Sequence, residues 1–133
     1  MAIRSETMQK RVLSVLKRRA RPASAYAVLD ELRGEHPKLA PATVYRALSA
    51  LTENGYVHRV ESINAFIARQ THADVSTSIL SICDDCGVVE ETVSHNLIAD
   101  LSRLMEKSGF SPQHHVIEVH GQCESCCGNG GAE

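Results

Sequence analysis

Apolar residues recur at intervals of three and four through the first part of the chain, and this spacing predicts three helices. They are expected at about residues 6–19, from Ser24 to Gly34, and from Pro41 to Asn54 and Gly55. Two β-prone runs follow, at residues 56–60 and 64–67. The inward-facing helix residues are expected to be Met8, Val12, Val15 and Leu16, then Tyr26, Val28, Leu29 and Leu32, then Val44, Leu48 and Leu51. Three helices followed by a two-stranded wing make a winged helix-turn-helix.

The third helix of such a unit enters the major groove of DNA. Thr43, Tyr45 and Arg46 lie near its start and off its apolar stripe, so they are the candidate DNA-binding residues. Arg46 is suited to a purine edge or a phosphate, and Tyr45 to a backbone phosphate or a thymine methyl. The simpler alternatives are a solvated charge for Arg46 and a partly buried aromatic for Tyr45.

The second half of the chain has a different pattern. Residues 77–82, 88–93 and 115–120 are predicted strands, and Ser94 opens a helix that ends at Ser108 and Gly109. The expected apolar residues of this helix are Leu97, Ile98, Leu101, Leu104 and Met105. One apolar helix beside exposed strand edges is typical of a dimer-forming unit. We therefore expect an α+β chain with a winged helix-turn-helix at 1–68, a hinge at 69–76, a small α/β dimerisation domain at 77–127 and a disordered tail at 128–133.

Two CxxC pairs stand out in this second half, with Cys83 and Cys86 in the first and Cys123 and Cys126 in the second. Four thiolates at such spacing suit one tetrahedral Zn²⁺ ion, which would staple a domain with a marginal core. The fifth cysteine, Cys127, makes the count odd and weakens a purely disulfide interpretation. A thiol-disulfide enzyme is disfavoured because acidic residues flank both pairs. A zinc-stapled RNA-binding or protein-interaction module would explain the cysteines, but not the winged helix.

The net charge of −2 conceals a division of the chain. Residues 1–60 carry 11 Lys and Arg against 5 Asp and Glu, whereas residues 61–133 carry 3 against 11. A basic half followed by an acidic half favours binding of an anionic polymer by the first part and of cations by the second. The alternative is that both sets of charges are ordinary solvated surface. No apolar run approaches the roughly 18 residues of a membrane span, and the N-terminus lacks a signal-peptide core. We therefore expect a cytoplasmic protein without a membrane partner.

Three motifs carry a family resemblance. They are PATVYRAL at residues 41–48, GYVHRVESINAF at residues 55–66 and CDDCG at residues 83–87. In this order they resemble the ferric uptake regulator family, over roughly residues 7–127. The run through the wing and the HHVIEVHG stretch at residues 114–121 are most similar to its zinc uptake regulator branch.

This resemblance implies a homodimeric, metal-dependent transcriptional repressor, not an enzyme, that binds double-stranded operator DNA and represses metal-uptake genes. It also implies that Cys83, Cys86, Cys123 and Cys126 hold a structural Zn²⁺. A second, regulatory Zn²⁺ would lie at the hinge. The matching ligand positions are His58, His72 and Glu91.

The chain departs from the branch at Ala68, where relatives supply a cysteine. The fourth ligand of the regulatory metal is then water, Asp74 or another residue. Losing a soft thiolate shifts the preference of a site toward Fe²⁺ or Mn²⁺, so an iron, manganese or peroxide sensor is the alternative within the family. It also remains open that His58 and His72 are ordinary wing and loop residues.

The remaining histidines near the second CxxC pair are His114, His115 and His120. His115 with Glu118 is a candidate additional metal site, although a supporting or structural role is favoured. Cys127 is expected to be a free thiol, because adjacent cysteines rarely both reach one tetrahedral ion.

Overall fold

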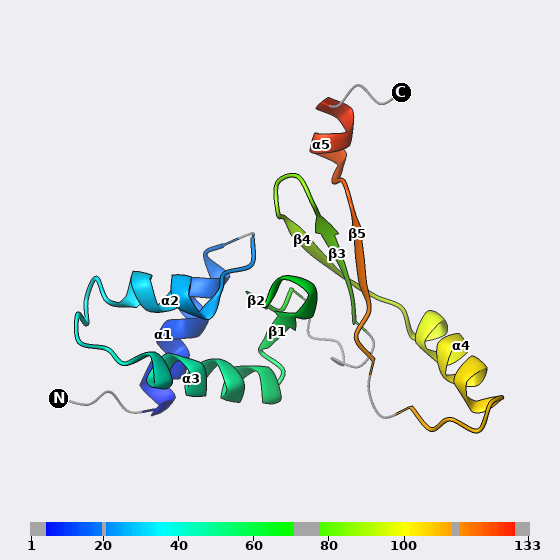
Figure 1. Cartoon of the computed structure of the whole chain (residues 1–133), viewed down its shortest axis with the longest axis horizontal. Helices are drawn as coiled ribbons and strands as arrows, with labels where there is room; N and C mark the ends of the chain where they lie inside the picture. The colour runs from blue at the N-terminus through cyan, green and yellow to red at the C-terminus, as the bar shows by residue number, and fades with distance from the viewer. Residues whose placement is uncertain (1–4, 20, 71–77, 113–114, 130–133) are drawn as a thin grey trace. The chain divides into compact units, whose positions relative to one another are not determined.

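A computed structural model describes residues 5–19, 21–70, 78–112 and 115–129 (Figure 1). The chain divides into two compact units, Met1–Arg69 and Gln70–Glu133. The expected hinge at 69–76 falls at this division, but its residues 71–76 lie outside the described ranges, so the hinge stays a prediction. Within the described residues, no helix has the length and apolar character needed to cross a membrane.

The first unit begins with three helices, α1 (Ser5–Lys17), α2 (Ala25–Leu32) and α3 (Pro41–Glu53). Helix α2 starts where predicted, because the Ser24 hydroxyl accepts a hydrogen bond from the backbone N–H of Ala27 at 3.0 Å. Helix α3 starts at a proline, whose missing N–H is not needed in the first turn. Their apolar stripes form one core, and the largest fully buried residues that the three helices contribute to it are Met8, Val12, Val15, Leu16, Val28, Val44 and Leu48. The three predicted helices are confirmed.

One predicted core residue is wrong. Tyr26 is 73% exposed, and Ala25 is buried in its place. The buried face of α2 runs through Ala25, Val28, Leu29 and Leu32. This is the i, i+3, i+4, i+7 spacing of a helix, and Tyr26, one residue on from Ala25, is turned about 100° away from that face.

The wing consists of β1 (Val57–Val60), the short 3-10 turn η1 (Glu61–Ile63) and β2 (Ala65–Ala68). The strands are antiparallel, and Asn64 in a left-handed conformation ends the turn between them. Ala23 and Phe66 exchange backbone hydrogen bonds of 2.9 and 2.8 Å. The wing is therefore tied to the segment that leads into α2.

The second unit is built on a three-stranded sheet of β3 (Ser78–Cys83), β4 (Val89–Val93) and β5 (Glu118–Gly121). The strand order is β4-β3-β5, with β4 antiparallel and β5 parallel to β3. Helix α4 (His95–Glu106) follows β4, and its cap Ser94 accepts from the N–H of Leu97 at 3.2 Å. The predicted elements are present, although β5 begins at residue 118 instead of 115.

A further helix, α5 (Glu124–Asn129), was not predicted. It begins inside the second CxxC pair and includes Gly128 and Asn129, which were expected to belong to a disordered tail. Its first turn closes through a 2.8 Å hydrogen bond from the Cys127 N–H to the Cys123 carbonyl. Helix α5 therefore extends into the first two residues of the expected tail, and residues 130–133 lie outside the described part of the chain, so the tail stays a prediction.

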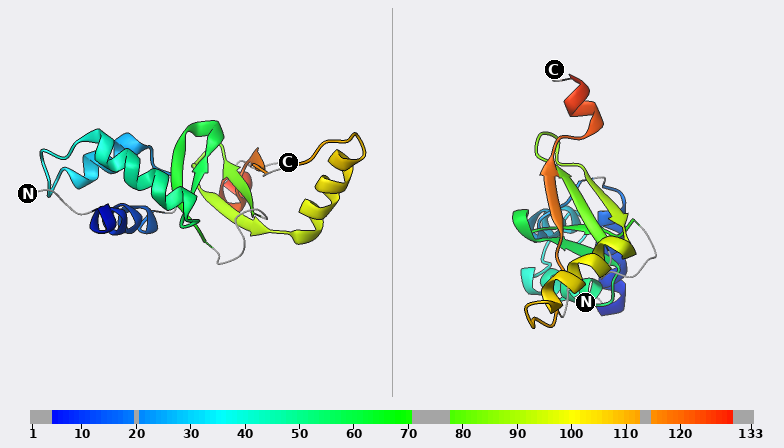
Figure 2. Two further views of the ribbon diagram at one scale, coloured as in Figure 1. Left: turned by 90° about the horizontal axis from the view of Figure 1, so that it is seen from below. Right: turned by 90° about the vertical axis from the view of Figure 1, so that its right-hand side faces the viewer.

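The apolar face of α4 is only partly covered within the chain. Ile98 is buried, but Leu97 is 47% and Leu104 58% exposed. Figures 1 and 2 show this helix projecting beyond the end of the sheet of its own unit. Leucines on a helix that packs fully against its own sheet would be buried, so this face is available to a partner.

Candidate metal centre and nucleic-acid interface

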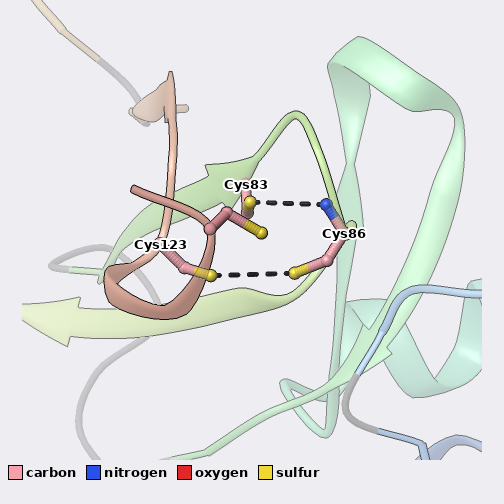
Figure 3. A group of neighbouring side chains, drawn as sticks. Cys83, Cys86 and Cys123 are labelled. Atoms are coloured by element: carbon pink, nitrogen blue, oxygen red, sulfur yellow. Dashed lines mark hydrogen bonds between the residues drawn. The ribbon is translucent and has the colours of Figure 1, made fainter. Parts of the chain in front are cut away.

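The two CxxC pairs come together at one end of the sheet. The Sγ atoms of Cys83, Cys86, Cys123 and Cys126 all lie within 4.8 Å of one another. The Cys86 and Cys123 sulfurs are 3.8 Å apart, and Figure 3 shows them turned toward each other with Cys83 beside them. A tetrahedral Zn²⁺ with Zn–S bonds of about 2.3 Å places its sulfurs roughly 3.8 Å apart. A disulfide would need about 2.05 Å. The predicted cluster is confirmed, and its donors fit a Zn²⁺ ion.

The backbone of the first pair is shaped to present both thiols. Cys83 ends β3, and the chain turns back so that the N–H of Gly87 donates to the Cys83 carbonyl at 2.9 Å. Gly87 has a φ of 82°, a conformation that a residue with a Cβ rarely adopts. The Cys86 N–H points at the Cys83 sulfur, 3.4 Å away. The turn thus converts two nearby cysteines into two converging ligands.

Two side-chain bonds join this turn to the segment before the second pair. The Asp84 carboxylate contacts Nδ1 of His120 at 2.8 Å, and Gln122 donates to Asp85 at 2.7 Å. The Asp84 N–H also donates to the Gly121 carbonyl at 2.8 Å. The two acidic residues inside the first CxxC therefore link the turn to His120 of β5 and to Gln122, which follows this strand.

The pKa values of Cys83 and Cys126 are shifted in opposite directions. The pKa of Cys83 is lowered to about 6, mainly because the backbone N–H of Cys86, and then that of Cys123, stabilises its thiolate. The pKa of Cys126 is raised to about 12, because hydrogen bonds to the Cys123 and Cys83 sulfurs hold its proton. A divalent cation replaces such shared protons and allows all four sulfurs to be anionic.

The predicted regulatory ligand Glu91 has two hydrogen-bond donors on its carboxylate. The Ser78 hydroxyl donates to Oε2 at 2.6 Å, and the backbone N–H of Gln70 donates to Oε1 at 2.7 Å. Ser78 is buried at the start of β3. The two donors approach different oxygens, so they fix the orientation of the carboxylate. Neither donor was found from the sequence, because Gln70 lies 21 residues from Glu91 and no local pattern links them.

The other predicted regulatory residues belong to the first unit or lie outside the described residues. His58 lies on β1 of the first unit, whereas Glu91 belongs to the second. His72 and the alternative ligand Asp74 lie outside the described residues. Ala68 ends β2 and is buried.

The candidate additional site at His115 is not supported as a metal cluster. Its Nε2 lies 3.5 Å from the Ser102 hydroxyl of α4. Among the described residues, the cysteines alone form a group of three or more possible ligands. His115 therefore packs against α4, and His114 is outside the described residues. Cys127 is exposed and is not a member of the four-sulfur group.

The start of α3 presents the predicted DNA-binding residues. Tyr45 is 56% exposed, Arg46 is exposed and Thr43 is half-buried, while Val44, Leu48 and Leu51 are buried. The alternative of a partly buried aromatic is therefore wrong for Tyr45. An exposed tyrosine and arginine on consecutive positions form a polar surface suited to phosphates and base edges.

Comparison with known proteins identifies the family. The model of the ferric uptake regulator family matches residues 2–120. The chain belongs to the ferric uptake regulator family. Within it, the zinc uptake regulation protein of Escherichia coli (strain K12) is 39% identical over 129 residues, which cover 93% of this chain and 73% of that protein. The zinc uptake regulation protein of Mycobacterium tuberculosis (strain H37Rv) is 28% identical over 113 residues, with 77% and 78% covered.

Solved structures of family members agree with this assignment. A zinc uptake regulator complexed with zinc and DNA has a TM-score of 0.90 and 37% identity, covering 98% of this chain and 87% of that one. The holo form of XcZur has a TM-score of 0.85 and 34% identity, covering 96% and 89%. The predicted fold of this family member, a helical winged unit followed by an α/β unit with a four-cysteine cluster, is thereby confirmed.

Proposed function

We propose that this family member is a zinc-responsive transcriptional repressor, which binds double-stranded operator DNA as a homodimer in the cytoplasm and controls metal-uptake genes. The observation that carries the proposal is its likeness, over almost its whole length, to a relative solved with zinc and DNA. Family membership makes it a metal-responsive regulator of DNA and not an enzyme. Four cysteines supply a structural zinc site, and the exposed start of α3 supplies groups for DNA.

The regulatory metal is proposed to bind His58, His72 and Glu91. Two imidazoles and one carboxylate make a donor set that accepts Zn²⁺. Supporting evidence comes from Glu91, whose carboxylate is oriented by two hydrogen-bond donors, as carboxylates that bind metals commonly are. A metal held by residues of both units binds one arrangement of the units better than others, and it shifts their population by that difference in affinity.

A homodimer is supported by two features of the second unit. The leucines of α4 are half exposed, and β5 stands at the edge of the sheet with Val119 54% exposed. Both features are typical of surfaces covered by a second copy. A dimer carries two recognition helices, and it engages two operator half-sites when their spacing matches the DNA repeat.

The direct test uses protein that has been mildly chelated, so that only the structural zinc remains. A duplex is first selected from a random library in the presence of Zn²⁺. Its affinity is then measured as Zn²⁺, Mn²⁺ or Fe²⁺ is restored. We expect Zn²⁺ to raise the affinity by about 5–150-fold, the usual range of allosteric coupling, and Mn²⁺ and Fe²⁺ to do less. Equal affinity with and without every metal would contradict the proposal.

A second candidate, a sensor of iron, manganese or peroxide, is favoured by one residue. Ala68 stands where a thiolate is expected, and a site with nitrogen and oxygen donors alone is less selective for Zn²⁺. In the test above, activation by Mn²⁺ or Fe²⁺ without activation by Zn²⁺ would establish this candidate.

Replacing Ala68 with cysteine is expected to raise the preference of the regulatory site for Zn²⁺ over Mn²⁺ by at least about tenfold, because a soft ligand is added. The measurement is competitive metal binding against a chromophoric chelator. Ala65→Cys is the matched control, since Ala65 is an equally buried alanine at the other end of β2. An equal gain in the two variants would mean that position 68 does not face the metal.

Replacing Arg46 with alanine is expected to weaken operator binding by about 1–3 kcal/mol, because a contact to a base or a phosphate is lost. Binding to operator variants across a salt series separates the two contacts. A base contact relaxes specificity at one position, whereas a phosphate contact lowers the salt slope by about one. Arg18→Ala removes the same charge from an arginine paired with Glu31 at 2.7 Å, and it should retain operator affinity. Equal losses of operator affinity in the two variants would mean that Arg46 contributes only its charge and makes no specific contact with the operator.

A further inference from the structure

Gln70, the first residue of the second unit, is fastened to strand β4 by three hydrogen bonds. Its side-chain Nε2 donates to the Val89 carbonyl at 2.8 Å, and its Oε1 accepts from the Glu91 N–H at 2.8 Å. Its own backbone N–H donates to the Glu91 carboxylate at 2.7 Å. Gln70 thus bonds to both the backbone N–H and the side-chain carboxylate of Glu91.

The reason for this arrangement lies in the sheet. Among the described residues, strand β4 is an edge strand that pairs only with β3, so the backbone groups on its outer side need other partners. In the pairing of β3 with β4, Glu90 lies opposite Ser81. The neighbours of Glu90 on either side, Val89 and Glu91, turn a backbone carbonyl and a backbone N–H outward, and these two groups bond to Gln70. A carboxamide has the same donor and acceptor as a peptide group. The Gln70 side chain therefore acts as a one-residue extension of the sheet.

The same contacts orient the Glu91 carboxylate. Gln70 donates to one oxygen and Ser78 to the other, so rotation of the carboxylate would break at least one bond. Ligating carboxylates are commonly held in this way, and loss of such partners typically weakens metal binding by about 10–100-fold. Gln70 and Ser78 each donate one hydrogen bond to the Glu91 carboxylate, but they differ in their position in the chain.

Gln70 adjoins the division between the two units. The preceding residue, Arg69, is held by the first unit, since its N–H donates to the Tyr56 carbonyl at 3.1 Å and its guanidinium to the Gly55 carbonyl at 3.4 Å. One peptide bond therefore separates Arg69, which is bonded to the turn between α3 and β1, from Gln70, which is bonded to β4. Ser78, by contrast, lies inside the second unit at the start of β3.

From this we infer that Gln70 is a positioning residue that couples the Glu91 carboxylate to the junction of the two units. The inference rests on the proposed function, in which Glu91 binds the regulatory metal. A metal that fixes the carboxylate favours the hydrogen-bonded state of Gln70 and restricts the backbone at the junction. Because such coupling is reciprocal, the hydrogen bonds of Gln70 in turn favour the orientation of the Glu91 carboxylate that binds the metal.

The test compares Gln70→Ala with Ser78→Ala in the full chain. Zn²⁺ affinity of the regulatory site and operator affinity at saturating Zn²⁺ are measured for each. Both variants are expected to bind Zn²⁺ about 10–100-fold more weakly. At saturating Zn²⁺, Ser78→Ala should regain wild-type operator affinity, whereas Gln70→Ala should stay at least about fivefold weaker, because the link to the junction is gone. Full recovery of Gln70→Ala would overturn the inference.

Amide hydrogen exchange provides a readout in the chelated protein that needs no regulatory metal. Removing the Gln70 side chain should accelerate exchange of the Glu91 N–H, which it accepts, while the amides of β3 keep their protection. Gln70→Asn, with an amide one methylene shorter, should behave like Gln70→Ala. Unchanged protection of Glu91 would overturn the contact itself. A wild-type chain without any zinc response would instead overturn the proposed function, and the coupling with it, independently of the exchange result.

Discussion

Replacing Cys83 with serine is expected to unfold the Gln70–Glu133 unit and to leave the Met1–Arg69 unit folded. The sheet has three strands, and α4 leaves its leucines half exposed, so packing alone gives this unit little stability. Structural Zn²⁺ contributes about 10–16 kcal/mol of apparent binding free energy to small domains, and that energy is folding energy. Serine supplies no thiolate, so most of this contribution is lost.

The first unit should stay folded because its hydrophobic core is formed entirely by its own residues. Every residue of its buried cluster lies between Met8 and Ala68. The measurement is zinc content per chain together with amide spectra of both units. We expect the variant to lose the tight Zn²⁺ and the dispersed signals of β3, β4 and β5, while α1, α2 and α3 keep theirs.

Cys127→Ser is the matched control for this prediction. Cys127 follows a ligand directly in the sequence, but its thiol is exposed and stands outside the four-sulfur group. The control should keep one tight Zn²⁺ and the melting behaviour of the wild type. If Cys83→Ser and Cys127→Ser behaved alike, the four-sulfur group would not be the staple of this unit.

Sequence reasoning was most successful where the signal is local. Ser24, Pro41 and Ser94 mark the helix starts because capping is decided within one turn. The CxxC spacing predicted the metal cluster for the same reason, since a tight turn after β3 brings its two thiols together whatever the rest of the chain does.

The predictions that failed also have physical causes. Tyr26 was assigned to the core for its apolar ring, but the small Ala25 occupies the buried position on the helical stripe. Helix α5 was missed because its last two residues, Gly128 and Asn129, have low helix propensity, whereas its first turn is set by the second CxxC pair. The partners of Glu91 were missed because they depend on which strand forms the sheet edge, and strand order is a long-range property.

Replacing Glu91 with glutamine is expected to abolish activation of DNA binding by Zn²⁺ while the structural zinc remains. The two side chains have nearly the same shape, so the fold of β4 should persist. Glutamine is neutral, however, and one of its terminal groups is a donor that faces either Ser78 or Gln70, both of which donate to the carboxylate. The variant loses the anionic ligand and the arrangement that orients it.

The fold increase in operator affinity on adding Zn²⁺, which is about 5–150-fold for typical coupling, should fall to about one in Glu91→Gln. Glu90→Gln is the matched control. Glu90 is the exposed neighbour on the same strand, and the substitution removes the same charge. Zinc content should be one ion per chain after mild chelation in both variants, which separates loss of sensing from loss of folding. If Glu91→Gln kept the zinc response of Glu90→Gln, the carboxylate would not be a ligand, and the hydrogen bonds from Gln70 and Ser78 would serve only to close the edge of the sheet.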